Sequence, residues 1–264
     1  MKRVTIFAYG VASYVIFLAT FLYAIGFIGN FGVPKSIDSG REVPLAQAIL
    51  TNAALLGIFA VQHSVMARKW FKRAWTRIVP EPAERSTYVL FSSLCLIAMF
   101  YFWEPMGGVI WNVENAAGRM ALQGVFFLGF GIVLVSTFLI NHFDLFGLRQ
   151  VYLYLAGRRY TALKFRTPML YQHVRHPLYL GWLLAFWAAP TMTAAHLLFA
   201  LATTIYIFIA IQFEERDLVR DHGEVYRRYK QSTPMIIPVK APPSKRTAGP
   251  TPSRVGTAAA GGSV

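Results

Sequence analysis

Three short clusters of polar side chains interrupt a sequence that is otherwise strongly apolar. The first is Gln62-His63-Ser64, and the second is Asn141-His142-Phe143-Asp144. The third combines Tyr171–Gly181 with Glu214-Glu215-Arg216-Asp217. Histidine exchanges a proton near neutral pH and also ligates metals, while carboxylates and tyrosine hydroxyls hydrogen-bond to polar ligands. These residue types indicate proton transfer or the binding of a small polar molecule.

Each cluster, taken alone, is equally typical of a structural role. His63 would then hydrogen-bond a neighbouring helix, and Asn141 and Asp144 would cap a helix end. His173 and His176 are spaced for metal binding, but the sequence offers no further well-spaced ligand, so we predict no metal site. A functional role is therefore indicated only if the fold brings the clusters together.

The composition identifies the class of protein. Of the 264 residues, 55% are hydrophobic and only 14% are charged, against about 25% charged residues in soluble domains. The net charge of +14 does not indicate nucleic-acid binding, because the basic residues lie in short segments between apolar runs. A single cysteine, Cys95, excludes an intramolecular disulfide framework. The chain is predicted to be an integral membrane protein.

Apolar runs predict an all-α fold with five to six transmembrane helices. The runs are Val4–Gly29, Leu45–Met66, Thr87–Trp103, Met120–Ile140, Leu178–Ala189 and Ala194–Phe213. A span needs about 20 residues, so the fifth run is too short to cross the membrane alone. Since Pro190 follows it, we predict a helical hairpin over 178–213, with one long kinked helix as the alternative.

The distribution of basic residues predicts the orientation in the membrane. The 67–86 and 141–176 segments are strongly basic. In contrast, Asn30–Val43 has equal numbers of basic and acidic residues, and the charged residues of Glu104–Gly118 are all acidic. The positive-inside rule then places both termini and both basic segments in the cytoplasm. All three polar clusters fall at cytoplasmic ends of spans, which predicts one cytosol-facing cleft. Residues 1–240 would form the membrane domain, and the Ala-, Pro- and Gly-rich 241–264 segment a disordered tail.

The third cluster also carries a family resemblance. Its elements are Tyr171, Arg175-His176-Pro177-x-Tyr179-x-Gly181, Glu214-Glu215 and Gly223-Glu224-x-Tyr226-x-x-Tyr229. In this order and spacing they resemble the isoprenylcysteine carboxyl methyltransferase-like superfamily, which includes bacterial NnrU-type proteins. The resemblance implies a membrane methyltransferase that binds S-adenosylmethionine in a cytosol-facing pocket, with residues 160–235 as the cofactor-binding part.

Motifs in the first two-thirds of the chain narrow the resemblance. Gln62-His63-Ser64-x-Met66-Ala67-Arg68, Glu84-Arg85-Ser86-x-Tyr88 and the segment Asn141–Gln150 are similar to those of bacterial methanethiol S-methyltransferases. Such enzymes convert methanethiol to dimethyl sulfide. The prenylcysteine enzymes carry an arginine for a substrate carboxylate shortly before the acidic pair. Here that stretch is Ala210-Ile211-Gln212, which suits a substrate without a carboxylate.

The resemblance implies roles for individual residues. Cofactor contacts are assigned to Tyr171, His173, His176, Tyr179, Glu214 and Glu215, substrate contacts to His63 and Asn141, and catalytic roles to His142, Asp144 and Arg175. Methyl transfer to sulfur requires a thiolate, so the site must accept the thiol proton or stabilise the anion. The candidates are His142, oriented by Asp144, and a cation such as Arg68, Arg149 or Arg175. The implied partners are a small volatile thiol and the lipid bilayer, with no nucleic acid and no protein partner. The implied location is the bacterial inner membrane.

Two alternative functions remain open from the sequence. The first keeps the methyltransferase chemistry but changes the acceptor to a prenylcysteine carboxylate or another lipidic group. The second is a non-enzymatic membrane protein of the NnrU kind, which would bind no cofactor. The retained set of Tyr171, His176, Tyr179 and Glu214 favours an enzyme over this last alternative.

Overall fold

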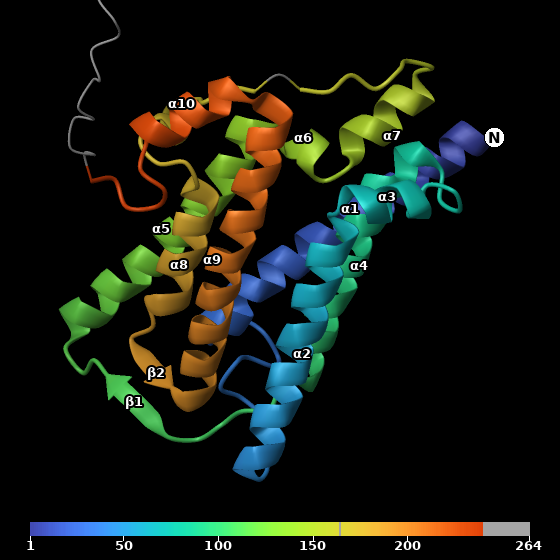
Figure 1. Cartoon of the computed structure of the whole chain (residues 1–264). Coiled ribbons are helices and arrows are strands. Elements are labelled where there is room, and N and C mark those ends of the chain that lie inside the picture. The colour runs from blue at the N-terminus through green and yellow to red at the C-terminus, as the bar shows by residue number, and fades with distance from the viewer. Residues whose placement is uncertain (164, 240–264) are drawn as a thin grey trace, which may run out of the picture.

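A computed structural model of the chain describes residues 1–163 and 165–239 (Figure 1). The predicted disordered tail, 241–264, lies outside the described residues. Within them, five helices are long and apolar enough to cross a membrane: α1 (Lys2–Gly29), α2 (Leu45–Met66), α4 (Glu81–Phe102), α5 (Ala116–Ile140) and α9 (Ala194–His222). The all-α membrane architecture predicted from the sequence is therefore confirmed.

Shorter elements complete the fold. They are α3 (Lys69–Trp75), α6 (His142–Leu145), α7 (Leu148–Leu155), the 3-10 helix η1 (Met169–Gln172), α8 (Pro177–Trp187), α10 (Glu224–Ser232) and the strands β1 (Val109–Asn112) and β2 (Thr191–Thr193). The strands pair antiparallel as a small ribbon. Figure 1 shows this ribbon at one end of the bundle and α3, α6, α7 and α10 at the other.

Helices α4 and α9 extend furthest beyond their predicted spans. Helix α4 begins at Glu81 rather than Thr87, because Pro82 and two acidic residues in the first turn favour a helix start there. Helix α9 continues from the predicted end at Phe213 to His222. Its last turns are polar, so they extend out of the apolar bundle and carry the acidic cluster with them.

The chain between 178 and 213 forms the predicted hairpin, and the single kinked helix is wrong. Helix α8 has 11 residues, a rise of about 16 Å, which is about half the thickness of the hydrocarbon core. It ends before the ribbon, and the Thr193 hydroxyl then caps α9 by accepting a hydrogen bond from the His196 backbone N–H at 3.1 Å. The turn therefore has its own hydrogen-bonding structure.

A close contact between two glycines joins α8 to α5. A Cβ atom added at Gly181 would lie 2.6 Å from the carbonyl oxygen of Gly129, and one added at Gly129 would lie 2.6 Å from that of Gly181. Small residues of this kind let membrane helices approach backbone to backbone. The glycine that ends the Arg-His-Pro-x-Tyr-x-Gly motif is therefore a packing residue, and it holds the start of α8 in place.

Candidate active site

A cavity of about 430 Å³ lies between α1, α2, α4, α5, α8 and α9, which is a usual size for a small-molecule site. Most of its wall is apolar. Its ionisable lining residues are His63, Arg85, Tyr88, His142, Tyr171, Arg175, His176, Tyr179, Tyr206 and Glu214. Each of the three polar clusters contributes at least one of them, so the expectation of a single shared cleft is confirmed.

The loop before α8 is held by the segment that follows α10. The backbone N–H groups of Arg175 and His176 donate to the carbonyl oxygens of Pro234 and Met235 at 2.9 and 3.0 Å. Pro177 then occupies the first turn of α8, where its missing N–H costs nothing. The C-terminal segment therefore fixes the position of His176 at the helix start.

Tyr229 ties α10 to the same loop. Its hydroxyl donates to the backbone carbonyl of Tyr171 at 2.5 Å. Burial raises the pKa of Tyr229 to about 12, so the hydroxyl keeps the proton that this hydrogen bond requires. Tyr226, also on α10, is buried. The two tyrosines of the Tyr-x-x-Tyr motif therefore pack and anchor α10.

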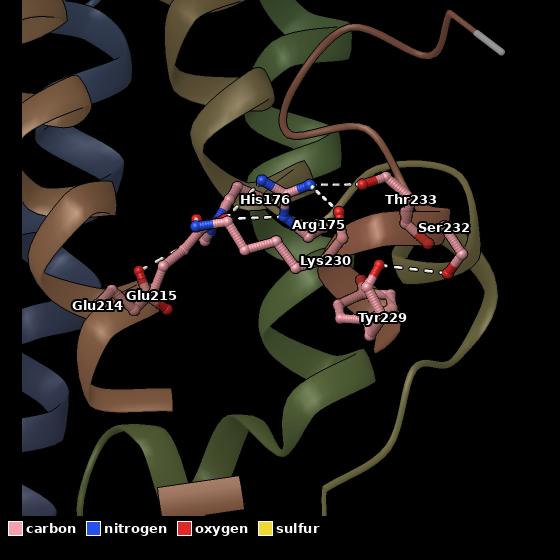
Figure 2. Close-up of polar contacts among 8 residues, drawn as sticks. All are labelled: Arg175, His176, Glu214, Glu215, Tyr229, Lys230, Ser232 and Thr233. Atoms are coloured by element: carbon pink, nitrogen blue, oxygen red, sulfur yellow. Dashed lines mark hydrogen bonds and ion pairs between the residues drawn. The ribbon is translucent and has the colours of Figure 1, made fainter. Parts of the chain in front are cut away.

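Glu215 is the centre of a buried ionic network (Figure 2). Its carboxylate accepts from Nε of Arg175 at 2.7 Å and from Nζ of Lys230 at 2.6 Å, and Nε2 of His176 lies at 3.2 Å. Arg175 also donates to the carbonyl oxygens of Lys230 and Thr233. Glu215 was expected to contact the cofactor, and Arg175 to act in catalysis. In the structure both residues join the start of α8 to α9 and α10, and Arg175 also lines the cavity.

Glu214 has different surroundings although it is adjacent in sequence. Its side chain is 45% exposed and lines the cavity together with Tyr171 and Tyr179. Its Oε2 atom lies 3.9 Å from Nδ1 of His176. Two like charges in adjacent positions are tolerated because Glu215 is neutralised by Arg175 and Lys230, while Glu214 is solvated. Glu214 is therefore the carboxylate available to a ligand.

His142 lies at the cavity, but Asp144 does not orient it. Its Nε2 and Nδ1 atoms lie 2.8 Å from the Tyr14 hydroxyl and the Thr137 hydroxyl. Asp144 pairs with Arg149 at 2.8 Å instead, because the single turn of α6 directs the two side chains apart. Burial lowers the pKa of His142. The expected His142–Asp144 pair is therefore wrong.

Two further predicted contacts lie away from the cavity formed by the described residues. The Asn141 side chain accepts from the Asp144 backbone N–H at 3.1 Å and so caps α6, which confirms its capping reading. His173 is exposed directly after η1. Neither is among the lining residues. Both residues belong to motifs that the family resemblance uses, but in this structure neither side chain points into the cavity.

His63 hydrogen-bonds a neighbouring helix and also faces the cavity. It lies 2.9 to 3.0 Å from the hydroxyl of Tyr88 and 3.2 Å from that of Ser92, both on the neighbouring helix α4. It also lines the cavity. A histidine that links α2 to α4 thus contributes a polar edge to the apolar wall.

Sequence reasoning missed three lining residues. Arg85 was taken as a topology determinant, yet it faces the cavity, donates from Nε to the Leu145 carbonyl at 2.7 Å and lies over the ring of Tyr88. Tyr88 appeared only within the family resemblance. Tyr206 lies 3.1 Å from the Ser64 hydroxyl. Tyr206 could have been recognised in the sequence as a tyrosine inside the apolar run of α9, because its hydroxyl needs a polar partner there.

Comparison with known proteins identifies the family. The chain is 59% identical over 238 residues to a methanethiol S-methyltransferase of Crocosphaera subtropica, which covers 90% of this chain and 93% of that protein. It is 54% identical to a methanethiol S-methyltransferase of Mycobacterium tuberculosis, over 90% of this chain and 98% of that protein. A more distant relative is nurim of Rattus norvegicus, at 31% identity over 77% of this chain and 82% of that protein.

No family model matches the chain, and no solved structure matches it. The relatives match over nearly their whole length, and their range includes α2, α4 and α9, from which the cavity is built. The resemblance carried by the sequence motifs is confirmed. The chain belongs to the methanethiol S-methyltransferase family and is a membrane methyltransferase.

Proposed function

We propose that this chain transfers a methyl group from S-adenosylmethionine to methanethiol and releases dimethyl sulfide. The observation that carries the proposal is its close similarity to several proteins named methanethiol S-methyltransferase. The cavity supports it, because one space combines a polar end with a long apolar wall. A donor with several charges and an acceptor with almost no polarity need that combination.

The polar end of the cavity fits the methyl donor. S-adenosylmethionine carries sulfonium and ammonium cations and ribose hydroxyls, and when bound it supplies an electrophilic methyl group. The carboxylate of Glu214 accepts hydrogen bonds from an ammonium or from ribose, and the rings of Tyr171 and Tyr179 attract cations. The first turn of α8 offers backbone N–H groups to a carboxylate. We therefore place the donor within residues 160–235.

The apolar wall fits the methyl acceptor. Lining residues on α4 extend from Arg85 to Phe100, a rise of about 22 Å, so the cavity reaches deep into the bundle. Methanethiol has few hydrogen-bonding groups and loses little by leaving water for such a wall. Arg85 is the cation that would stabilise a thiolate there, since the charge of Arg175 is compensated by Glu215. No observation favours a prenylcysteine or lipidic acceptor.

We further propose that the protein lies in the bacterial inner membrane with both termini in the cytoplasm. The basic segments around α3 and α7 lie at the same end of the bundle as α10 (Figure 1), and the positive-inside rule assigns that end to the cytoplasm. S-adenosylmethionine is a cytosolic metabolite in this proposal, so it would reach Glu214 directly from that side.

Headspace gas chromatography tests the function on the purified full-length protein. With S-adenosylmethionine and methanethiol we expect dimethyl sulfide well above a reaction without enzyme. Donor labelled in the transferred methyl group should give labelled product. Absence of product, together with calorimetric binding of S-adenosylhomocysteine, would exclude methanethiol as acceptor. Absence of both would contradict the proposal as a whole.

A further inference from the structure

We propose that His176 is the general base of the reaction and takes the thiol proton on Nδ1, while Glu215 holds the opposite ring nitrogen. The inference rests on the proposed function, because it names the group that makes the thiolate. Alkyl thiols resemble cysteine, whose pKa is about 8.5, and are mostly protonated at neutral pH. A proton acceptor beside the sulfur should therefore increase the rate of methyl transfer strongly.

Three histidines line the cavity among the described residues: His63, His142 and His176. Both ring nitrogens of His142 are engaged, by the hydroxyls of Tyr14 and Thr137. The ring of His63 is held between the hydroxyls of Tyr88 and Ser92. These two imidazoles have no ring nitrogen left for a substrate proton in the present arrangement. His142, the base suggested by the sequence, therefore does not fit this role.

His176 is arranged differently. Its Nε2 atom lies 3.2 Å from the carboxylate of Glu215, and an imidazole that donates from Nε2 carries its lone pair on Nδ1. Within the described residues Nδ1 has no hydrogen-bond partner, and its nearest charged atom is Oε2 of Glu214 at 3.9 Å. His176 also lines the cavity, where a bound substrate would sit.

The buried network explains why the orientation of His176 is stable. Glu215 is held in place by Arg175 at 2.7 Å and Lys230 at 2.6 Å (Figure 2). A carboxylate fixed in this way keeps the proton on Nε2 and stabilises the imidazolium that forms when Nδ1 is protonated. Arg175, Glu215 and Lys230 are positioning residues in this arrangement. They act on the reaction only through the imidazole.

The step balances in atoms and charge. The thiol S–H bond breaks, and its proton goes to Nδ1 of His176. A sulfur lone pair forms the new S–CH3 bond while the methyl–sulfonium bond breaks, and that electron pair remains on the donor sulfur. The products are the thioether and S-adenosylhomocysteine. The proton then leaves through Glu214, whose half-exposed carboxylate lies next to Nδ1, to water.

The acidity of the acceptor thiol provides the critical test. We would compare His176→Gln with the wild type on methanethiol and on 2,2,2-trifluoroethanethiol, a larger thiol that is a stronger acid, at about pH 8. General bases contribute about 10²- to 10⁴-fold. We expect a loss in that range with methanethiol but a much smaller loss with the fluorinated thiol, which is already largely thiolate. Arg77→Gln, at an exposed position in the turn before α4, is the control and should behave as wild type.

Binding of S-adenosylhomocysteine, measured by calorimetry, separates this role from donor binding. His176→Gln should bind it within a few-fold of the wild type. Loss of that binding, an equal loss of activity on both thiols, or full activity on methanethiol would each overturn the assignment. A wild-type protein that is inactive on both thiols would overturn the proposed function and this assignment with it.

A pH profile tests the positioning role of Glu215. The ionisable groups around His176 are Arg175 on its own loop, Tyr179 on α8, Glu214 and Glu215 on α9, and Lys230 on α10. Glu215→Gln removes the charge that favours the imidazolium, so the acidic limb of the methanethiol profile should shift to lower pH. An unchanged acidic limb in a folded Glu215→Gln protein would overturn the pairing.

Discussion

Glu214 and Glu215 are adjacent on α9, yet their carboxylates have opposite surroundings. Adjacent residues on an α-helix point about 100° apart, so one side chain faces the cavity and the other faces α10. Glu214 is 45% exposed, whereas Glu215 is 3% exposed and contacts three cationic or imidazole groups. The acidic pair of the motif therefore divides into a ligand-facing residue and a structural one.

This division predicts different results for the two alanine variants. Glu215→Ala leaves Arg175 buried without its counter-charge, and breaking such a pair costs about 3–5 kcal/mol. Thermal unfolding in detergent should show a large decrease in melting temperature. Glu214→Ala removes a half-exposed carboxylate and should melt close to the wild type. Equal melting temperatures for the two variants would contradict the assignment.

Glu214→Gln should weaken donor binding without affecting the fold. The side chain keeps its shape but loses the charge that attracts the ammonium group, and hydrogen bonds to charged groups contribute about 1.5–3 kcal/mol. We expect the dissociation constant for S-adenosylhomocysteine to rise by about 10- to 100-fold. Calorimetric titration measures it, and Glu224→Gln on the exposed face of α10 is the control. An unchanged affinity would remove Glu214 from the donor site.

The glycine contact between α5 and α8 predicts a sharp positional effect. Gly129→Ala places a methyl group against the backbone of Gly181 and Ala185, at 2.6 and 2.7 Å. Such overpacking costs at least about 1–3 kcal/mol. Gly131→Ala lies two residues away on the same helix, where the new methyl would have no described atom within 4 Å apart from those of its own stretch of helix. It should be neutral or stabilising. Comparable melting temperatures would show that the helices are not in close contact.

Burial of His142 predicts a loss of stability in acid. The pKa of this imidazole is lowered below its ordinary value of 6.5 by burial, so the unfolded chain binds the proton more tightly. Its contribution to stability is present above about pH 6.5 and is lost as the pH falls through the folded-state pKa. The melting temperature should decrease less between about pH 7 and 5 in His142→Gln than in the wild type. Parallel profiles would contradict this contribution.

Arg85 should affect the acceptor half of the reaction. Arg85→Gln keeps a side chain that reaches the Leu145 carbonyl but removes the only charge on that side of the cavity wall among the described lining residues. Loss of one such stabilising group costs about 10²- to 10³-fold in kcat. Arg77→Gln, at an exposed position in the turn before α4, is the control. A kcat equal to that of the wild type would exclude a role for the Arg85 charge.

The sequence predicted those features that depend on composition and local order. Apolar runs located α1, α2, α5 and both arms of the hairpin, because twenty apolar residues have few alternatives to crossing a bilayer. Arg-His-Pro marked the start of α8, since proline favours the first helical turn. Local patterns of this kind also brought the three polar clusters to one cavity.

Side-chain directions were not predictable in the same way. The proximity of His142 and Asp144 in sequence suggested a pair, but Thr137 and Tyr14 are the actual partners of the imidazole. Tyr14 lies 128 positions away, and no local pattern reports such a contact. The pairing of Glu215 with Lys230 is of the same type, because it depends on how α10 folds back against α9.

The contact between Gly129 and Gly181 restricts how these proteins can change over time. Each residue already has the smallest side chain, and the atoms that an added methyl would meet belong largely to the opposing backbone. No second substitution at the contact can make room for the first. Across an alignment the two positions should therefore be invariant and show no covariation, so methods that infer proximity from correlated changes would miss this close contact between α5 and α8.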